Sequence, residues 1–117
     1  MTIHTSNFAH TCKAVNPVAI SRTMPKGIAI PQYRPLMPSW SLLMDYRDHR
    51  ITTEGYIRRY TEELSRLNRD RVLSDLRALT GSDTVTLICW EASGDFCHRH
   101  ITKAWLEGRP FTGDFRD

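Results

Sequence analysis

The chain has 117 residues and a formal net charge of +3, and apolar residues make up 40% of it against 25% charged residues. This length suits one domain with one modest hydrophobic core, and the composition is typical of a globular protein rather than a disordered chain. No apolar run is long enough to cross a bilayer and the N-terminus lacks the pattern of a secretory signal, so we expect a cytoplasmic protein. Three cysteines are an odd number, which excludes a complete disulfide framework and fits a reducing compartment.

The N-terminal part of the chain contains one predicted strand. Residues 1–16 are polar and mixed, and we expect this end and the tail at 109–117 to pack more loosely than the rest of a single domain over 1–117. A short apolar run predicts a buried strand over 18–22, with Arg22 at its carboxyl end. Arg22 therefore stands where a strand meets a loop.

The middle of the chain predicts helices. Three prolines between residues 31 and 38 indicate a loop, and Ser39 after it is a suitable N-cap for a short helix. Apolar side chains at three- and four-residue steps then predict a helix over 53–67. A second stripe of this kind predicts a helix over 69–80, which Gly81 ends.

An apolar, β-branched stretch predicts the central strand over 84–90. Both faces of this strand are mostly apolar, so we expect helices to cover both sides of it. Glu91 breaks the pattern at its carboxyl end, which is where ligands bind in open α/β sheets. An amphipathic helix follows over 96–107, with Asp95 as the expected N-cap and Arg99 on the outer side.

The alternation of strands and helices predicts an α/β fold, with a small, mainly parallel sheet flanked by helices in a Rossmann-like three-layer arrangement. The two predicted strands should lie side by side and parallel. Their carboxyl ends then bring Arg22 near Glu91 and the turn that carries Cys97. Because free N–H groups at the start of a helix attract anions and lower a nearby thiol pKa, Cys97 is a candidate thiolate.

At these residues the sequence resembles a known family. The strand ends in Cys89-x-Glu91, and after a short turn the residues Cys-His-Arg open a helix from Cys97. This pattern resembles the signature of domain-of-unknown-function (DUF) family 488, and the strand that ends in Arg22 resembles that family too. The resemblance covers about 18–106 and implies an α/β fold but no settled activity. It also implies a polar cluster of Arg22, Cys89, Glu91, Cys97, His98 and Arg99.

The cluster can be interpreted as an enzyme site, with a thiolate, acid–base groups and a clamp of two arginines for an anion. The catalytic candidates are Glu91, Cys97 and His98. The ligand-binding candidates are Arg22, Cys89 and Arg99. A tyrosine-phosphatase loop is disfavoured because no arginine stands six positions after either cysteine of the cluster. Walker loops, dinucleotide-binding glycine fingerprints and serine elbows are also absent.

Two other interpretations remain open. The cluster can be a non-catalytic pocket for a nucleotide, a phosphate or a nucleic-acid end, with help from aromatic residues such as Trp40, Tyr46 and Trp90. It can also be a zinc or iron site. The ligands would then be Cys89, Glu91, Cys97 and either His98 or His100. Adjacent ligands on a helix are awkward and the spacing is not that of a zinc knuckle, so we expect that folding requires no metal and no cofactor.

The structural alternative is that the cysteines are small buried hydrophobes and that Glu91 only forms ion pairs with the arginines. It does not explain why so many polar types converge on one strand end, since their burial is costly. The net charge permits an anionic partner without demanding a nucleic acid, because the arginines are spread and often stand beside acids. We therefore expect a small anionic ligand, most simply a nucleotide or another phosphate-bearing molecule, with a nucleic acid as the alternative partner and no membrane contact.

Overall fold

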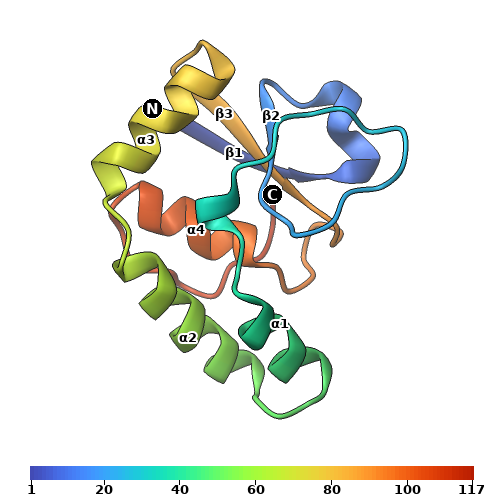
Figure 1. The fold of residues 1–117 in the computed structure, drawn as a ribbon, viewed down its shortest axis with the longest axis vertical. Helices are drawn as coiled ribbons and strands as arrows, with labels where there is room; N and C mark the ends of the chain where they lie inside the picture. The colour runs from blue at the N-terminus through green and yellow to red at the C-terminus, as the bar shows by residue number, and fades with distance from the viewer.

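Strand β3 (Thr84–Cys89) is the centre of a three-stranded sheet in the computed structural model, which describes residues 1–117 (Figure 1). Strand β1 (Thr2–Asn7) pairs with one edge of β3 and strand β2 (Pro17–Ala19) with the other, both parallel to it. The order is therefore β1-β3-β2. The predicted α/β class is confirmed, and so is the parallel pairing of the two predicted strands.

Strand β1 lies in the N-terminal segment for which the sequence predicted no element. Ile3, Thr5 and Asn7 are buried at alternate positions, as in a half-buried strand. Two of these three inward side chains are polar, so the alternation is not visible as a hydrophobic pattern. Pairing with β3 makes this segment part of the sheet rather than a loosely packed extension.

Two 3-10 helices and four α-helices complete the chain. The 3-10 helices are η1 (Phe8–Lys13) and η2 (Arg34–Leu36). The α-helices are α1 (Trp40–Arg47), α2 (Thr53–Ser65), α3 (Arg69–Thr80) and α4 (His98–Leu106). Side-chain oxygens of Ser39, Thr52 and Asn68 accept hydrogen bonds from first-turn N–H groups of α1, α2 and α3. Gly81 ends α3 in the left-handed conformation with φ of 65°. None of these helices has the length and apolar character needed to span a bilayer.

Helix α4 begins later than the sequence predicted. Its N-cap is Cys97, and the expectation that Asp95 is the N-cap is wrong. The ring of Phe96 packs 4.9 Å from Tyr56 and 5.2 Å from Tyr46, measured between ring centroids. Phe96 is thus fixed by aromatic packing between Asp95 and the helix. Cys97 after it is still extended, with φ of −155° and ψ of 144°, so the helix begins only at His98.

The two faces of the sheet are covered by different kinds of structure. Val85 and Leu87 of β3 contribute to a large core that includes buried side chains of α2, α3 and α4. Ile88 faces the other side, where it packs with Phe8 of η1 and with the loop after β2. Figure 1 shows α3 and α4 on one side of the strands and η1 with this loop on the other. A layer covers each face, as a Rossmann-like arrangement requires, but α-helices form only one of them.

The C-terminal tail packs against the turn before α4. The ring of Phe115 packs edge-on against Phe96 at 5.2 Å and at a tilt against Phe111 at 5.1 Å, measured between ring centroids, and the Gly94 N–H donates to the Phe115 carbonyl over 2.9 Å. The tail is therefore held by aromatic packing and by the backbone, although the sequence predicted looser packing.

Candidate functional site

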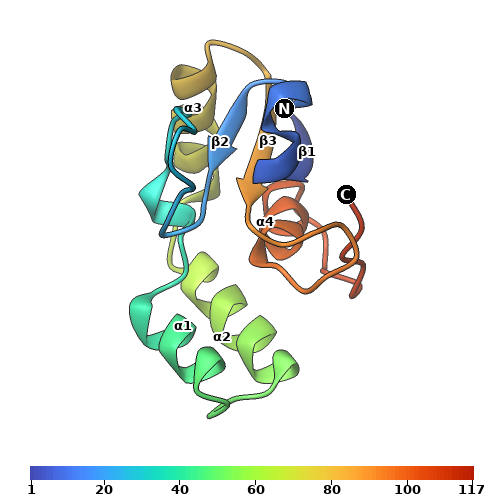
Figure 2. The same ribbon diagram turned by 90° about the vertical axis from the view of Figure 1, so that its right-hand side faces the viewer.

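A pocket of about 400 Å³ opens at the carboxyl ends of β2 and β3. Side chains from α1, α2 and the start of α4 form its other walls. In Figure 2 the α1–α2 pair lies beyond the end of the sheet to which the strands point, and residues of both helices line the pocket. The pocket is lined by five of the six residues of the predicted cluster, namely Arg22, Cys89, Glu91, Cys97 and His98.

Arg22 is held in place on one side of its guanidinium. Its Nε donates to the carbonyl oxygen of Pro38 over 2.7 Å, and its Cζ lies 5.3 Å from the centre of the Trp40 ring. The two Nη groups have no acceptor within the chain. A guanidinium fixed in this way presents a planar fork of donors, which matches the oxygens of a phosphate or carboxylate.

Aromatic side chains form much of the pocket wall. Trp40 and Trp90 are 54% and 49% exposed, which is unusual for such large apolar side chains. The Trp90 Nε1 donates to the Thr23 carbonyl over 3.0 Å, so the orientation of this exposed ring is fixed. Tyr46 also lines the pocket, so the three aromatic residues predicted to assist binding are all present there.

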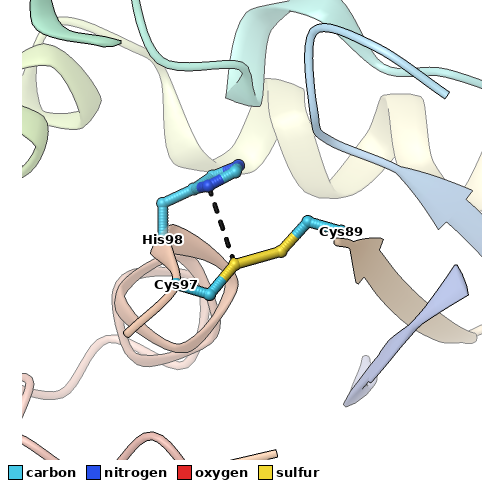
Figure 3. Close-up of side chains that lie close together, drawn as sticks. All are labelled: Cys89, Cys97 and His98. Atoms are coloured by element: carbon cyan, nitrogen blue, oxygen red, sulfur yellow. Dashed lines mark hydrogen bonds between the residues drawn. A yellow bond between two sulfur atoms is a disulfide. The ribbon is translucent and has the colours of Figure 1, made fainter. Parts of the chain in front are cut away.

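The two cysteines of the cluster lie at the floor of the pocket and are joined by a disulfide (Figure 3). Cys89 ends β3 and Cys97 precedes α4, and both are buried. The prediction treated Cys97 as a thiolate, but its sulfur is bonded in this structure and carries no charge. The odd cysteine count excludes only a complete framework, and Cys12 is the unpaired, exposed thiol.

His98 is buried beside this sulfur pair. Its Nε2 lies 2.8 Å from the Ile20 carbonyl oxygen, and its Nδ1 lies 3.8 Å from Cys97 Sγ (Figure 3). A carbonyl can only accept, so Nε2 carries the proton and Nδ1 keeps its lone pair. Burial lowers the pKa of His98 to about 4, so the ring is neutral at neutral pH.

Glu91 lies on the exposed rim of the pocket. The arginines with which it was expected to pair have other partners, because Arg22 donates to Pro38 and Arg99 pairs with Asp117. The interpretation of Glu91 as a purely structural partner of these arginines is therefore wrong. Its carboxylate is available to a ligand or to solvent.

Arg99 does not line the pocket. The expectation that it lies on the outer side of its helix is wrong, because its side chain is completely buried. Nε and Nη2 donate to the two carboxylate oxygens of Asp117 over 2.9 Å each, and Nη1 donates to Cys89 Sγ over 3.2 Å. The tail places the Asp117 carboxylate against α4. Helical periodicity alone cannot predict the burial of Arg99, because this partner comes from a distant part of the chain.

His100 belongs to the same tail contact rather than to the pocket. Its Nε2 lies 2.9 Å from an oxygen of Asp117, and burial lowers its pKa. Of the two histidines considered as alternative metal ligands, only His98 lies with the two cysteines.

One family model, described as DUF488-N3a, the active DUF488-N3 subclade, matches residues 8–110. The chain belongs to the DUF488 family. The resemblance read from the strand and helix signature is thereby confirmed, and the match extends upstream of the region that the resemblance covered. No curated protein and no solved structure matches the chain.

Two pocket residues of this DUF488 domain were missed by sequence reasoning. Tyr56 and Phe96 both line the pocket. Tyr56 is buried in α2 together with Tyr60 one turn later. The four-residue spacing of these tyrosines was an available signal. Phe96 carried no comparable signal, because its role depends on the turn between β3 and α4.

Proposed function

We propose that this DUF488 domain binds a small anionic ligand, most simply a nucleotide or another phosphate-bearing molecule, in the pocket at the end of the sheet. The observation that carries the proposal is the guanidinium of Arg22. It is oriented by Pro38 and Trp40, and it leaves both Nη groups without a protein acceptor at the pocket wall. Such a fork can bind a phosphate through two charge-assisted hydrogen bonds, and little side-chain entropy is lost because Arg22 is already held.

The start of α4 supports the same ligand chemistry. Cys97 is the N-cap of α4, yet its side chain makes no capping hydrogen bond. First-turn N–H groups without a side-chain cap favour negative charge, and the helix dipole adds to this effect. Both Cys97 and His98 line the pocket, so this helix end and the Arg22 guanidinium border the same space.

The aromatic wall indicates a planar group on the ligand. Trp40 and Trp90 are about half exposed at the pocket, and stacking of one base on an aromatic side chain contributes about 1–3 kcal/mol. Tyr56 offers a hydroxyl that has no hydrogen-bond partner within the chain. Burial raises the pKa of Tyr56, so this hydroxyl stays protonated and can donate to a ligand. A nucleotide combines the planar and anionic groups that such a pocket accommodates.

We further propose that the pocket is catalytic, which is consistent with the description of the matched subclade as active. Glu91 is the carboxylate free to move a proton, because it lies at the exposed rim. Cys97 and His98 form the reactive floor once the disulfide is reduced, as expected of a cytoplasmic protein. Arg99 supports the floor from behind and does not contact the ligand.

The test is a thermal-shift panel of nucleotides, inorganic phosphate and pyrophosphate, followed by calorimetry on any ligand that raises Tm. A ligand at one hundred times its Kd stabilises the folded state by about 2.7 kcal/mol, which is a clear shift. Arg22→Ala should remove the response. Arg58→Ala is the matched control, because Arg58 is an exposed arginine of α2 that does not line the pocket.

Two outcomes contradict the proposal. One is a panel in which no compound shifts the wild-type protein, and the other is an equal loss of binding in Arg22→Ala and Arg58→Ala. A short single-stranded oligonucleotide in the same panel tests the alternative partner. Binding of the oligonucleotide with a strong salt dependence, and without any response to mononucleotides, would favour a nucleic-acid interface.

A further inference from the structure

Three potential metal-ligand atoms converge at the floor of the pocket. Cys89 Sγ, Cys97 Sγ and one ring nitrogen of His98 all lie within 4.8 Å of one another, and all three residues are buried (Figure 3). The distance from Cys97 Sγ to His98 Nδ1 is 3.8 Å. Two ligands at about 2.3 Å (sulfur) and 2.0 Å (nitrogen) from a tetrahedral zinc lie roughly 3.5 Å apart. The spacing between Cys97 Sγ and His98 Nδ1 is therefore close to that of two zinc ligands, whereas the two sulfurs are bonded to each other and have to separate before they can bind a metal.

The backbone explains how adjacent residues can share a metal. Two neighbours within a helix point in different directions, which is why the sequence disfavoured joint ligation by Cys97 and His98. In the structure Cys97 is the N-cap and is extended, whereas His98 is the first helical residue. The change of backbone conformation between them turns both side chains towards the same point (Figure 3).

The second ring nitrogen of His98 is bonded as in a metal-ligating histidine. Its Nε2–H donates to the Ile20 carbonyl over 2.8 Å, which fixes the ring and leaves the Nδ1 lone pair towards the sulfurs. Metal-ligating histidines almost always donate their other N–H to a carbonyl or carboxylate in this way. A histidine buried for packing alone does not need its free lone pair to face two sulfur atoms.

The surroundings of the sulfurs also favour thiolates. Arg99 is completely buried, and its Nη1 donates to Cys89 Sγ over 3.2 Å, a contact that suits an anionic sulfur. Cys97 lies at the N-terminal end of α4, where the helix dipole stabilises a negative charge. The Cα atoms of the two cysteines are 7.6 Å apart, beyond the usual 4.4–6.8 Å of a disulfide. Two reduced sulfurs can thus separate to about 3.8 Å, as zinc requires, by side-chain rotation.

We propose that the reduced protein binds one zinc ion through Cys89 Sγ, Cys97 Sγ and His98 Nδ1, with the fourth position open to the pocket. Two thiolates and an imidazole suit zinc, and three protein ligands with an open position are the arrangement of catalytic zinc sites. The two sulfurs can bind zinc only after the disulfide between them is reduced. A thiol or phosphine reductant supplies two electrons, the S–S bond breaks, and each sulfur takes up a proton that is released when zinc binds.

The site lies where the proposed ligand would react. The zinc ligands and Glu91 line the same pocket as Arg22. When bound there, zinc would act as a Lewis acid towards a ligand oxygen or a water molecule. Glu91 at the rim can then transfer a proton, and Cys97 acts as a metal ligand rather than as a nucleophile. Zinc binding itself does not rest on the proposed nucleotide, because three protein atoms hold the metal without it.

The test uses the full chain, reduced with a phosphine, freed of metal with a chelator and titrated with cobalt(II) as a spectroscopic substitute for zinc. We expect one equivalent to bind, with thiolate-to-cobalt charge-transfer absorption and the visible bands of tetrahedral cobalt, both removed by added zinc. Cys89→Ser and Cys97→Ser should each lose much of the charge-transfer absorption. His98→Gln should weaken binding at least as much as loss of an outer-shell partner does, roughly tenfold or more.

Cys12→Ser is the matched control, because Cys12 is the exposed cysteine outside the pair. It should keep the full spectrum. A second measurement needs no variant: zinc should protect Cys89 and Cys97 of the reduced wild type from alkylation and leave Cys12 reactive, as read by peptide mass spectrometry. Wild-type protein that binds no cobalt through thiolates, or zinc that protects none of the pair, overturns the proposal. Nucleotide titrations are carried out on protein freed of metal with a chelator. The test of nucleotide binding with Arg22→Ala is then independent of the test of zinc binding.

Discussion

Arg99 and Asp117 form a bidentate ion pair, in which Nε and Nη2 of the guanidinium donate to the two carboxylate oxygens over 2.9 Å each. The arginine is completely buried, and the aspartate side chain is 17% exposed. The pair connects the first turn of α4 with the tail 18 residues later. Because Arg99 also donates to Cys89 Sγ, this contact helps to position the floor of the pocket.

Asp117→Asn should destabilise the fold, because it leaves a buried guanidinium without a counter-charge. Removal of one partner from a buried ion pair costs about 3–5 kcal/mol, and the partial exposure of Asp117 places the expected loss near the lower value. Urea unfolding monitored by circular dichroism measures it. Asp114→Asn is the control, because Asp114 pairs with the exposed Arg116, and a solvent-exposed ion pair contributes much less than a buried one. Equal losses in the two variants would contradict a structural role for the Arg99 pair.

The same aspartate should make stability depend on pH in the acid range. Burial opposes its ionisation, but hydrogen bonds and the charge of Arg99 outweigh burial and lower the pKa of Asp117 to about 2, from an ordinary 3.8. On acidification the unfolded chain binds this proton first, so the stabilisation is complete only well above the ordinary pKa of 3.8 and is lost as the pH falls through that value towards 2. The stability difference between wild type and Asp117→Asn should therefore narrow between pH 5 and pH 2. A difference that stays constant over this range would refute the assignment.

Tyr60→Phe should destabilise the junction of α2 and α4. The Tyr60 hydroxyl donates to the Leu36 carbonyl over 2.6 Å and lies 2.7 Å from Thr102 Oγ1, in a fully buried position. Its removal leaves buried polar atoms without a partner, at a cost of about 1–3 kcal/mol. Chemical denaturation provides the value. Tyr46→Phe, which loses one 3.2 Å hydrogen bond at a partly buried site, should cost less.

Trp90→Ala should distinguish the binding energy contributed by the planar part of the proposed ligand from that contributed by its anionic part. Loss of one stacking surface reduces binding by about 1–3 kcal/mol, so a nucleotide should bind roughly 5–150 times more weakly. Binding of inorganic phosphate should change little, because Arg22 is held by Pro38 and Trp40 rather than by Trp90. Calorimetric titrations of folded protein measure both affinities. An equal loss for phosphate and nucleotide would show that Trp90 does not act as a stacking surface.

Features that depend on neighbouring residues were predictable from the sequence. Ser39 begins a helix and Gly81 ends one through contacts a few residues away, and the structure has them in those positions. The central strand was equally predictable, because a run of apolar, β-branched residues favours a buried strand. The position of the site at the carboxyl end of that strand followed from the direction of parallel strands.

Other features depend on contacts between distant parts of the chain, and only the tertiary structure decided them. Strand β1 has polar inward residues, so its pairing with β3, about 80 residues later, was needed to reveal it. Helical spacing places Arg99 on the outer face of its helix. In the structure the tail covers this face, and Asp117 pairs with the buried arginine. His98 and Ile20 are 78 residues apart, yet their hydrogen bond selects the imidazole tautomer that faces the two sulfurs. Local propensity acts over a few residues, whereas the partners of buried polar groups are set by the path of the whole chain.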